Sequence, residues 1–248
     1  MQDGFVADAG DFGKYGLLRT LCNLEASAHD ARLRLGIVWC AVRGDGIGRL
    51  VRYWDYRQCD PVLYDQLQGI LHGARLMKSI EKSGVLGDET KFFDEPLNHK
   101  TIGVNSRRED RVRWLERACA ATEGYQVVFF DPDNGLNPVS VEKHHAAAPS
   151  YLFVDEIAPF LNRGQSVIIY HHMGRVGTVQ NQILRTLTKL KEFAPPSVHP
   201  FALRYRVGNS RAYLTIPSQE HEGLLSSRAD RMVLGNWKGP FEPVVYRS

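Results

Sequence analysis

The pattern of hydrophobic and polar positions predicts several strands that are covered on both faces. Mostly apolar runs occupy residues 35–41, 127–130 and 166–172, the last of which ends in two histidines, and a shorter candidate strand occupies residues 91–93. Runs of this kind, without polar alternation, are typical of strands inside a parallel sheet, because helices cover both sides of such a sheet. The chain therefore contains at least four candidate strands for one sheet.

Amphipathic helices are predicted between these strands. Leucine and isoleucine recur at helical spacing in residues 11–28 and 180–193. Residues 50–86 are predicted to be mainly helical, and one helix in this region starts at Asp60 and Pro61, which suit a cap and a first turn.

Two more helices are expected in the middle of the chain. Ser106, with Glu109 three residues later, has the spacing of a capping box and predicts the start of an arginine-rich helix. A further helix is expected over residues 151–161, with Pro159 close to its end.

The order of the predicted elements defines the expected fold. Strands alternate with helices, and the last two strands, near 199–206 and 211–216, are joined as an antiparallel hairpin. We therefore expect an α/β fold: a mostly parallel sheet with helices on both faces and a terminal hairpin. Without a repeat or a long linker, residues 1–248 are predicted to form one domain with a helical insertion at about 50–86.

The most informative polar segment follows the strand at 127–130. Its sequence is Asp-Pro-Asp-Asn-Gly, which includes Asp131, Asp133 and Asn134. A buried strand that ends in carboxylates and an amide delivers them to the carboxyl edge of the sheet, where open α/β sheets bind ligands. The alternative is a turn in which Asp131 and Asn134 bond only nearby backbone amides.

Two glycine-containing segments are expected near the same edge. Asp11 and Lys14 lie at the start of the first helix, where free N–H groups favour an anion and the lysine can neutralise it. Gly44, Gly46 and Gly48 follow the first strand, as a nucleotide-binding turn requires. A glycine-rich cap with a solvated lysine, and a plain loop, are the respective alternatives.

A pair of histidines ends the strand at 166–172. Neighbouring strand residues face opposite sides, so one of His171 and His172 is expected to pack and the other to reach the site. Both can instead be hydrogen-bonded structural residues.

Composition restricts the class of protein. Hydrophobic residues make up 43% and charged residues 24% of the 248 positions, which is ordinary for a globular protein. No apolar window is long enough for a transmembrane helix, the first residues do not form a secretory signal, and the four cysteines are scattered. We therefore expect a cytoplasmic protein with no membrane partner; the sequence makes no prediction of oligomeric state.

Basic residues are concentrated on the arginine-rich helix. The formal net charge is only +3, but Arg107, Arg111 and Arg117 are all predicted to lie on this helix. Arginine is well suited to bidentate phosphate contacts, so the helix is a candidate nucleic-acid contact. A solvated helix face explains the same run equally well.

Taken together, these segments resemble the bacterial 23S ribosomal RNA adenine-N6 methyltransferases. The segment at residues 6–15 is similar to the opening motif of that family, with Asp11 and Lys14 in matching places. The glycine turn and the Asp-Pro-Asp-Asn segment match its glycine-rich and Asp-Pro-Pro-Tyr motifs in order. The resemblance implies a Rossmann-like methyltransferase fold that binds S-adenosylmethionine. The chain also resembles a second bacterial family that shares its Gly-Asp-Phe-Gly-Lys-Tyr-Gly and Asp-Pro-Asp-Asn-Gly-Leu segments, and this resemblance implies no activity.

The chain departs from the methyltransferase motif where Asp133 and Asn134 replace the second proline and the tyrosine. The aromatic ring that stacks on adenine is therefore missing at this position, although Phe130 or Tyr170 can substitute for it. The departure puts adenine as the target base in question but leaves cofactor binding as an expectation.

The leading hypothesis is thus a methyltransferase-like enzyme that acts on nucleic acid. Asp131, Asp133, Asn134 and His171 are its candidate catalytic residues, and Asp11, Lys14 and the three glycines its candidate cofactor-binding residues. An alternative is a nuclease or phosphohydrolase in which Asp131 and Asp133, with His171 or His172, hold Mg²⁺ or Mn²⁺. A binding protein without catalysis is the third hypothesis, since a fold alone does not define an activity.

Overall fold

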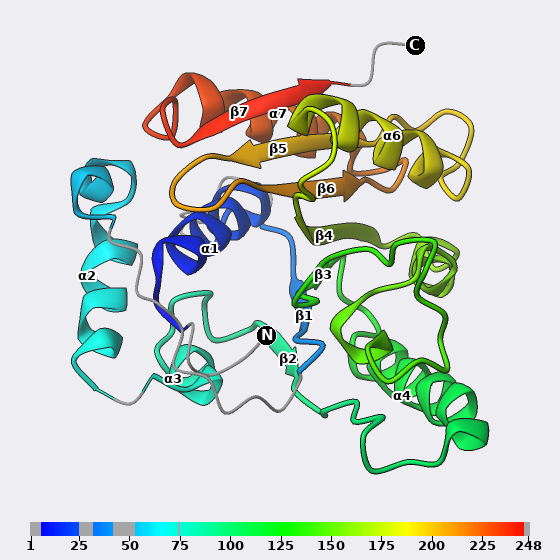
Figure 1. Cartoon of the computed structure of the whole chain (residues 1–248). Helices are drawn as coiled ribbons and strands as arrows, with labels where there is room; N and C mark the ends of the chain where they lie inside the picture. Colours follow the sequence, from blue (N-terminus) through cyan, green and yellow to red (C-terminus); the bar gives the residue numbers. More distant parts are fainter. Residues whose placement is uncertain (1–5, 25–31, 42–52, 74, 246–248) are drawn as a thin grey trace.

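Seven strands form one sheet in the computed structural model, which describes residues 6–24, 32–41, 53–73 and 75–245 (Figure 1). Across the sheet the strands lie in the order β2 (Lys91–Phe93), β1 (Leu35–Val38), β3 (Val127–Phe130), β4 (Ser166–His172), β6 (Arg211–Ile216), β5 (Phe201–Tyr205) and β7 (Phe241–Val245). The expected mixed α/β architecture is confirmed.

The sheet is mostly parallel in strand direction. β2, β1, β3 and β4 pair in parallel, with Ile37 opposite Phe129 and Phe129 opposite Ile168. β6 is antiparallel to both of its neighbours, β4 and β5, and β7 is antiparallel to β5. Five strands therefore run in one direction and two in the other. The predicted hairpin is β5 and β6, and the reversed strand β6 lies inside the sheet.

Helices cover both faces of the sheet because each buried strand is apolar on both sides. Along β3, Val127 and Phe129 belong to the hydrophobic cluster under α1 (Ala9–Cys22), whereas Val128 and Phe130 belong to the cluster on the opposite face. The first cluster also receives residues from α2 (Pro61–Leu71), α3 (Met77–Lys82) and α7 (Glu222–Leu234). The second is covered by α4 (Arg107–Ala121), α5 (Ala158–Leu161) and α6 (Val179–Lys191).

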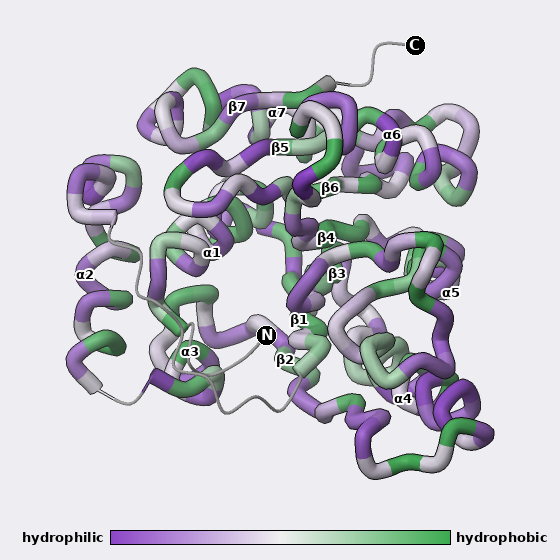
Figure 2. The backbone as a smooth tube through the Cα atoms, in the orientation of Figure 1, coloured by the Kyte–Doolittle hydropathy of each residue, from purple (hydrophilic) through white to green (hydrophobic). Residues whose placement is uncertain are grey.

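In the 50–86 region, α2 begins at the cap and the proline that the sequence predicted. Asp60 caps α2, its side chain accepting a hydrogen bond from the Leu63 N–H at 2.9 Å, and Pro61 is the first helical residue. Hydrophobic and hydrophilic residues alternate along α2 in Figure 2. Its buried leucines, Leu63 and Leu67, join the cluster that lies under α1.

The helix predicted over residues 151–161 is wrong in its first half. Leu152 forms a parallel bridge with Leu136, so the chain is extended there. A 3-10 helix, η5 (Val154–Ile157), comes next, and α5 starts only at Ala158, with Pro159 in its first turn rather than near its end. Proline at this position fits because a first-turn N–H has no helical acceptor.

The capping box predicted at Ser106 is also wrong. Ser106 is the last residue of a 3-10 helix, η3 (Val104–Ser106), and has helical backbone angles of φ −92° and ψ −10°. Its side chain makes no capping hydrogen bond, because a cap requires the extended conformation that separates it from the first turn. The sequence reasoning also missed α7 and β7, which follow the hairpin.

No helix in the described ranges combines the length and the apolar character needed to cross a lipid bilayer.

The close packing of α1 against its neighbours leads to a stability prediction. A Cβ atom at Gly16 would lie 2.1 Å from the buried ring of Trp237. Gly16→Ala is therefore expected to lower the free energy of unfolding by about 1–3 kcal/mol through overpacking. Gly69→Ala on α2 is the matched control, because nothing lies within 4 Å of a Cβ there; it is expected to gain roughly 0.5–1 kcal/mol. Chemical denaturation measures both, and equal effects at the two positions would contradict the close approach.

Candidate functional site

The candidate site lies where the strand order of the sheet reverses. β2 flanks β1 on one side and β3 flanks it on the other, so the chain leaves the carboxyl ends of β1 and β3 in opposite directions. A crevice at such a switch point is the usual ligand site of open α/β sheets. Asp131 directly follows β3, and its backbone N–H donates to the carbonyl oxygen of Val38 at 3.0 Å.

The first turn of α1 is held in one conformation beside this edge of the sheet. Asp8 caps the helix, its Oδ1 accepting a hydrogen bond from the Asp11 N–H at 3.0 Å. The Asp11 carboxylate in turn accepts from the Ala7 N–H at 2.8 Å. Ala7 has a φ of 62°, an unfavourable conformation for a residue with a Cβ, and the Tyr53 hydroxyl donates to its carbonyl oxygen at 3.2 Å. This network fixes the direction of the Asp11 side chain.

Lys14 joins the helix to the sheet. Its Nζ lies 2.9 Å from Asp11 Oδ1 and 2.7 Å from Asp131 Oδ2. We call these three residues the carboxylate–lysine cluster. All three are at most 5% exposed, so their charges interact with little screening by water. The predicted proximity of Asp11, Lys14 and Asp131 is thus present in the structure.

The electrostatic environment keeps the lysine charged. Burial alone lowers the pKa of Lys14, but the carboxylates of Asp11 and Asp131 outweigh burial and hold this pKa well above its ordinary value. Burial raises the pKa of Asp131, and the Lys14 charge opposes the increase. The cluster therefore combines a permanently charged ammonium group with a carboxyl group that binds a proton more readily than usual.

Aromatic rings enclose the ammonium group. Lys14 Nζ lies 5.5, 5.8 and 5.9 Å from the ring centroids of Tyr15, Trp39 and Tyr170. The Trp39 ring is fixed by a hydrogen bond from its Nε1 to Glu81 Oε1 at 2.9 Å. Negative ring faces of this kind stabilise a cation, so the surroundings suit positive charge.

The remaining residues of the Asp-Pro-Asp-Asn segment lie further out. Asp133 is half-buried, and Asn134 is exposed, with its backbone N–H donating to the Ser150 carbonyl oxygen at 3.0 Å. Their predicted catalytic roles stay predictions.

His171 has a clear structural contact. Its Nδ1 accepts a hydrogen bond from the Leu136 N–H at 3.0 Å, and a Cβ at Gly135 would lie 2.3 Å from the same nitrogen. Burial, and to a smaller extent His172, lowers the pKa of His171 to about 4. The ring is therefore neutral at pH 7 and holds the loop that follows Asp131. His172 is exposed, and its Nδ1 lies 3.2 Å from the Tyr170 hydroxyl oxygen.

The predicted glycine turn cannot be placed, because Gly44, Gly46 and Gly48 lie outside the described residues.

Metal binding gains no support from the described side chains. Nowhere in these ranges do three or more His, Cys, Asp or Glu side chains form a group that can hold a metal ion. Asp131, the central ligand of the metal hypothesis, instead contacts the ammonium group of Lys14 at 2.7 Å. A cation at that distance would repel a divalent ion.

The arginine-rich helix α4 is largely occupied by intramolecular contacts. Arg111 is 2% exposed and donates to Glu156 Oε2 at 2.8 Å, so the expectation that it contacts nucleic acid is wrong. Helical spacing alone did not reveal that this face of α4 packs on the chain. Arg107 donates to backbone carbonyls, including that of His99 at 3.0 Å, and Arg117 pairs with Glu95 at 2.6 Å in an exposed position.

Two charged residues near the cluster were missed by the sequence reasoning. Asp8 stands three residues before Asp11, and this capping spacing was a usable signal. Arg211 starts β6 and is 6% exposed. No local pattern marks it, because its neighbourhood depends on how β6 is placed in the sheet.

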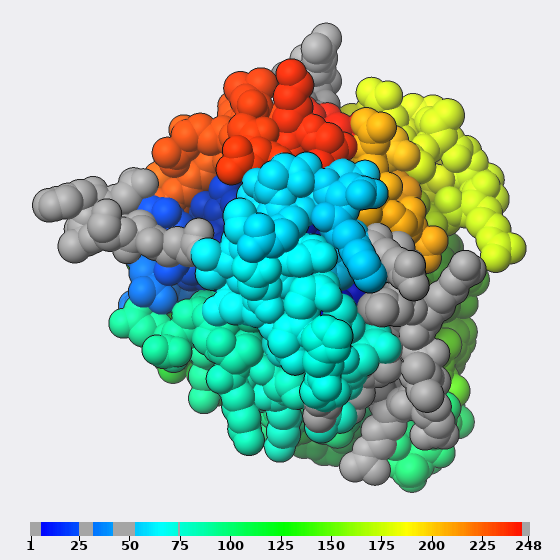
Figure 3. All heavy atoms as spheres, turned by 90° about the vertical axis from the view of Figure 1, so that its left-hand side faces the viewer, coloured from blue at the N-terminus to red at the C-terminus, as the bar shows by residue number. Residues whose placement is uncertain are grey.

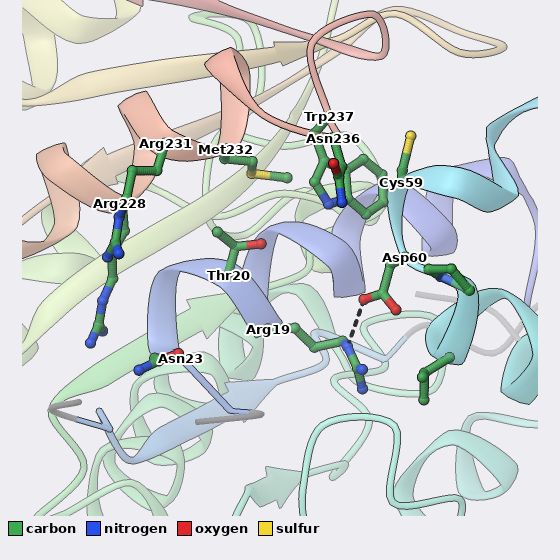
Figure 4. A pocket seen from close by; sticks show the side chains of 12 residues that line it. Arg19, Thr20, Asn23, Cys59, Asp60, Arg228, Arg231, Met232, Asn236 and Trp237 are labelled. Carbon is green, nitrogen blue, oxygen red and sulfur yellow. Dashed lines mark hydrogen bonds and ion pairs between the residues drawn. The ribbon is translucent and has the colours of Figure 1, made fainter. Parts of the chain in front are cut away.

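A separate cavity of about 440 Å³ lies over the second half of α1. Its lining includes Arg19 and Asn23 from α1 and its cap, Pro61 at the start of α2, and Arg228 and Met232 from α7 (Figure 4). The segment with α2 and α3 dominates the face shown in Figure 3, and only a small part of α1 is visible there. Among the residues that the structure describes, none of the site residues expected from the sequence lines this cavity.

Comparison of the chain with protein-family models, curated proteins and solved structures gave no match.

The buried charges of the cluster lead to a pH-dependent stability prediction. Lys14→Met removes the ammonium group and leaves two buried carboxyl groups without it, at an expected cost of about 3–5 kcal/mol near pH 7. Without Lys14 the folded pKa of Asp131 rises further above its ordinary value of 3.8, so the folded state binds a proton more tightly than the unfolded state. Stability is then lost as pH rises from about 4 through the folded pKa. The deficit relative to the wild type should therefore be smaller at pH 5 than at pH 7.5, as measured by urea denaturation.

Lys78→Met on α3 is the control for this experiment, because Lys78 is exposed. It is expected to change stability by no more than about 0.5 kcal/mol at either pH. A Lys14→Met deficit that does not change with pH would rule out uncompensated carboxyl groups as its cause.

Proposed function

We propose that the protein is an S-adenosylmethionine-dependent methyltransferase that acts on nucleic acid. The observation that carries the proposal is the position of Asp131, which follows β3 at the switch point and is joined there to Lys14 at the start of α1. A buried carboxylate with a raised pKa at a switch point is typical of a functional site rather than of a turn.

The direction of β6 supports a methyltransferase-type sheet. Rossmann-like methyltransferases have one antiparallel strand between two strands of the common direction, close to one end of the sheet. Here β6 is antiparallel to its two neighbours, β4 and β5. The hairpin of β5 and β6 is separate from the switch point between β1 and β3. The additional edge strand β7 is a departure from that arrangement.

The net charge of the carboxylate–lysine cluster fits the cofactor. S-adenosylmethionine carries a positive sulfonium group, and its bound form supplies an electrophilic methyl group. Two buried carboxylates, of Asp11 and Asp131, contact the single ammonium group of Lys14. The excess of one acid, together with the surrounding aromatic rings, favours a positively charged ligand.

The proposed role of Asp131 is to accept a hydrogen bond, and then a proton, from the target group. Its raised pKa makes it a better proton acceptor than an exposed aspartate. Lys14 holds this carboxylate in place and keeps it ionised until the target enters. Because Lys14 already contacts two carboxylates, we assign it to the positioning of Asp131 rather than to the cofactor binding that the sequence suggested.

Calorimetry and methyl transfer together test this proposal. The wild type is expected to bind S-adenosylmethionine and to transfer labelled methyl groups to deproteinised ribosomal RNA. Asp131→Asn keeps the size of the side chain but loses its basicity, so transfer should fall by roughly 100- to 10,000-fold while the cofactor still binds. Asp65→Asn, an exposed aspartate on α2, is the control and should leave both unchanged. Absence of cofactor binding to the wild type would refute the proposal.

The nucleic-acid part of the proposal predicts a salt-dependent affinity. Arg113 and Arg117 are about half exposed on α4, with side-chain exposures of 50% and 49%. If each contacts one phosphate, Arg→Gln at both should lower the slope of log affinity against log salt by roughly 0.7–0.9 per residue. Filter binding to RNA between about 50 and 200 mM salt measures the slope. An unchanged slope would place the RNA contact elsewhere on the surface.

A further inference from the structure

Arg211 is a buried cation without a direct polar partner in the described part of the chain. It is the first residue of β6 and lies opposite His172, so it belongs to the same sheet edge as Asp131. The residue is 6% exposed, and its Nε is buried with no hydrogen-bond partner. No described carboxylate lies within ion-pair distance of the guanidinium group, and no described oxygen accepts a hydrogen bond from it.

The immediate neighbours of Arg211 do not replace such a partner. The ring centroids of Tyr170 and Tyr205 each lie 6.0 Å from its Cζ, at the outer limit of a cation–π contact. The nearby acid is Asp8, which attracts the guanidinium electrostatically but uses its Oδ1 to accept the Asp11 N–H. Burial of a guanidinium without hydrogen-bond acceptors costs folding free energy, so a residue that only filled this space would be apolar.

The guanidinium group lies directly on the first turn of α1. A Cβ atom at Gly10 would come within 1.7 Å of Arg211 Nη1, so only glycine allows this approach. α1 has 14 residues, and the first N–H groups of a helix have no acceptor within the helix. Asp8 satisfies the N–H of Asp11, which leaves the N–H groups of the preceding turn residues as donors. The positive end of the helix and the guanidinium therefore converge on one point.

We propose that Arg211 and the first turn of α1 bind an oxyanion, namely a phosphate or carboxylate group of a small-molecule ligand. The planar fork of a guanidinium matches two oxygens of either group, and helix N–H groups bind the same oxygens. The oxyanion is the partner that the buried guanidinium lacks. This inference goes beyond the proposed function, since it depends on Arg211 and α1 alone and requires neither S-adenosylmethionine nor methyl transfer.

Anion-dependent thermal stability tests the proposal. Inorganic phosphate, adenosine monophosphate, acetate and L-methionine are titrated in a chloride buffer of constant ionic strength, and Tm is recorded. The wild type is expected to gain stability with at least one of these anions, because a ligand that binds only the folded state raises Tm. Arg211→Met, which keeps an unbranched apolar stem between the tyrosines, should weaken the apparent affinity by at least about tenfold.

Arg204→Met is the matched control. Arg204 lies on the adjacent strand β5 and pairs with Glu242 at 2.7 Å. Its variant should keep the anion response of the wild type, which separates a specific site from a general salt effect. If Arg211→Met does not fold, Arg211→Lys takes its place, because lysine keeps the positive charge but lacks the planar guanidinium group. The same loss of about tenfold in apparent anion affinity is expected.

The ligands also identify the source of the oxyanion. A response to phosphate and adenosine monophosphate assigns the site to a phosphorylated ligand, and a response to acetate and L-methionine assigns it to an amino-acid carboxylate; either supports the proposal. Absence of any response in the wild type overturns it, and so does a response that the Arg211 variant retains. Neither result decides whether S-adenosylmethionine binds, which calorimetry on the wild type tests separately.

Discussion

The ion pair between Lys14 and Asp131 is the interaction on which the candidate site depends. It joins the first helix to the end of the third strand across 117 positions of sequence. Removing two charges from water is costly, and the attraction between them offsets this cost only when the geometry is good and the remaining hydrogen bonds are made. Here Asp11 supplies the second contact of the ammonium group, and the backbone N–H of Ala7 orients the Asp11 carboxylate.

The same ion pair requires α1 to lie unusually close to its neighbours. Gly13 faces the ring of Tyr205, and Gly16 faces that of Trp237, in both cases at distances that exclude a side chain. These glycines let the helix axis approach until Lys14 reaches the sheet edge. A helix seated on larger residues would hold its lysine too far from Asp131, so packing along α1 and electrostatics at its start are parts of one arrangement.

The sequence predicted the strands better than the features that depend on contacts between distant segments. Apolar runs identified β3 and β4 because strands buried on both faces leave a strong local signal. The helix prediction fails at residues 151–153 because their extended shape comes from the bridge between Leu152 and Leu136, which periodicity does not show. α7 and β7 were not predicted, although α7 has a buried helical face that includes Leu225 and Met232.

The candidate site could also be predicted only in part from the sequence. Asp131, Lys14 and Asp11 each stand at the end or start of an element, so the sheet edge could be expected to collect them. Arg211 could not be found in this way, because it reaches the edge only through the reversed direction of β6. The burial of Arg111 could not be predicted either, because its partner, Glu156, lies 45 positions away in the sequence.

The reversed strand also affects the order in which the chain can fold. The edge around α1 needs the first turn of the helix, the end of β3 and the start of β6, so its parts span more than two hundred positions. Contacts of such long range form late, since the entropy of closing large loops must be overcome first. During synthesis α1 emerges early, while the strand that carries Arg211 emerges only after most of the sheet. A shortened chain that ends after β4 would contain every parallel strand from β1 to β4, yet its edge would lack Arg211.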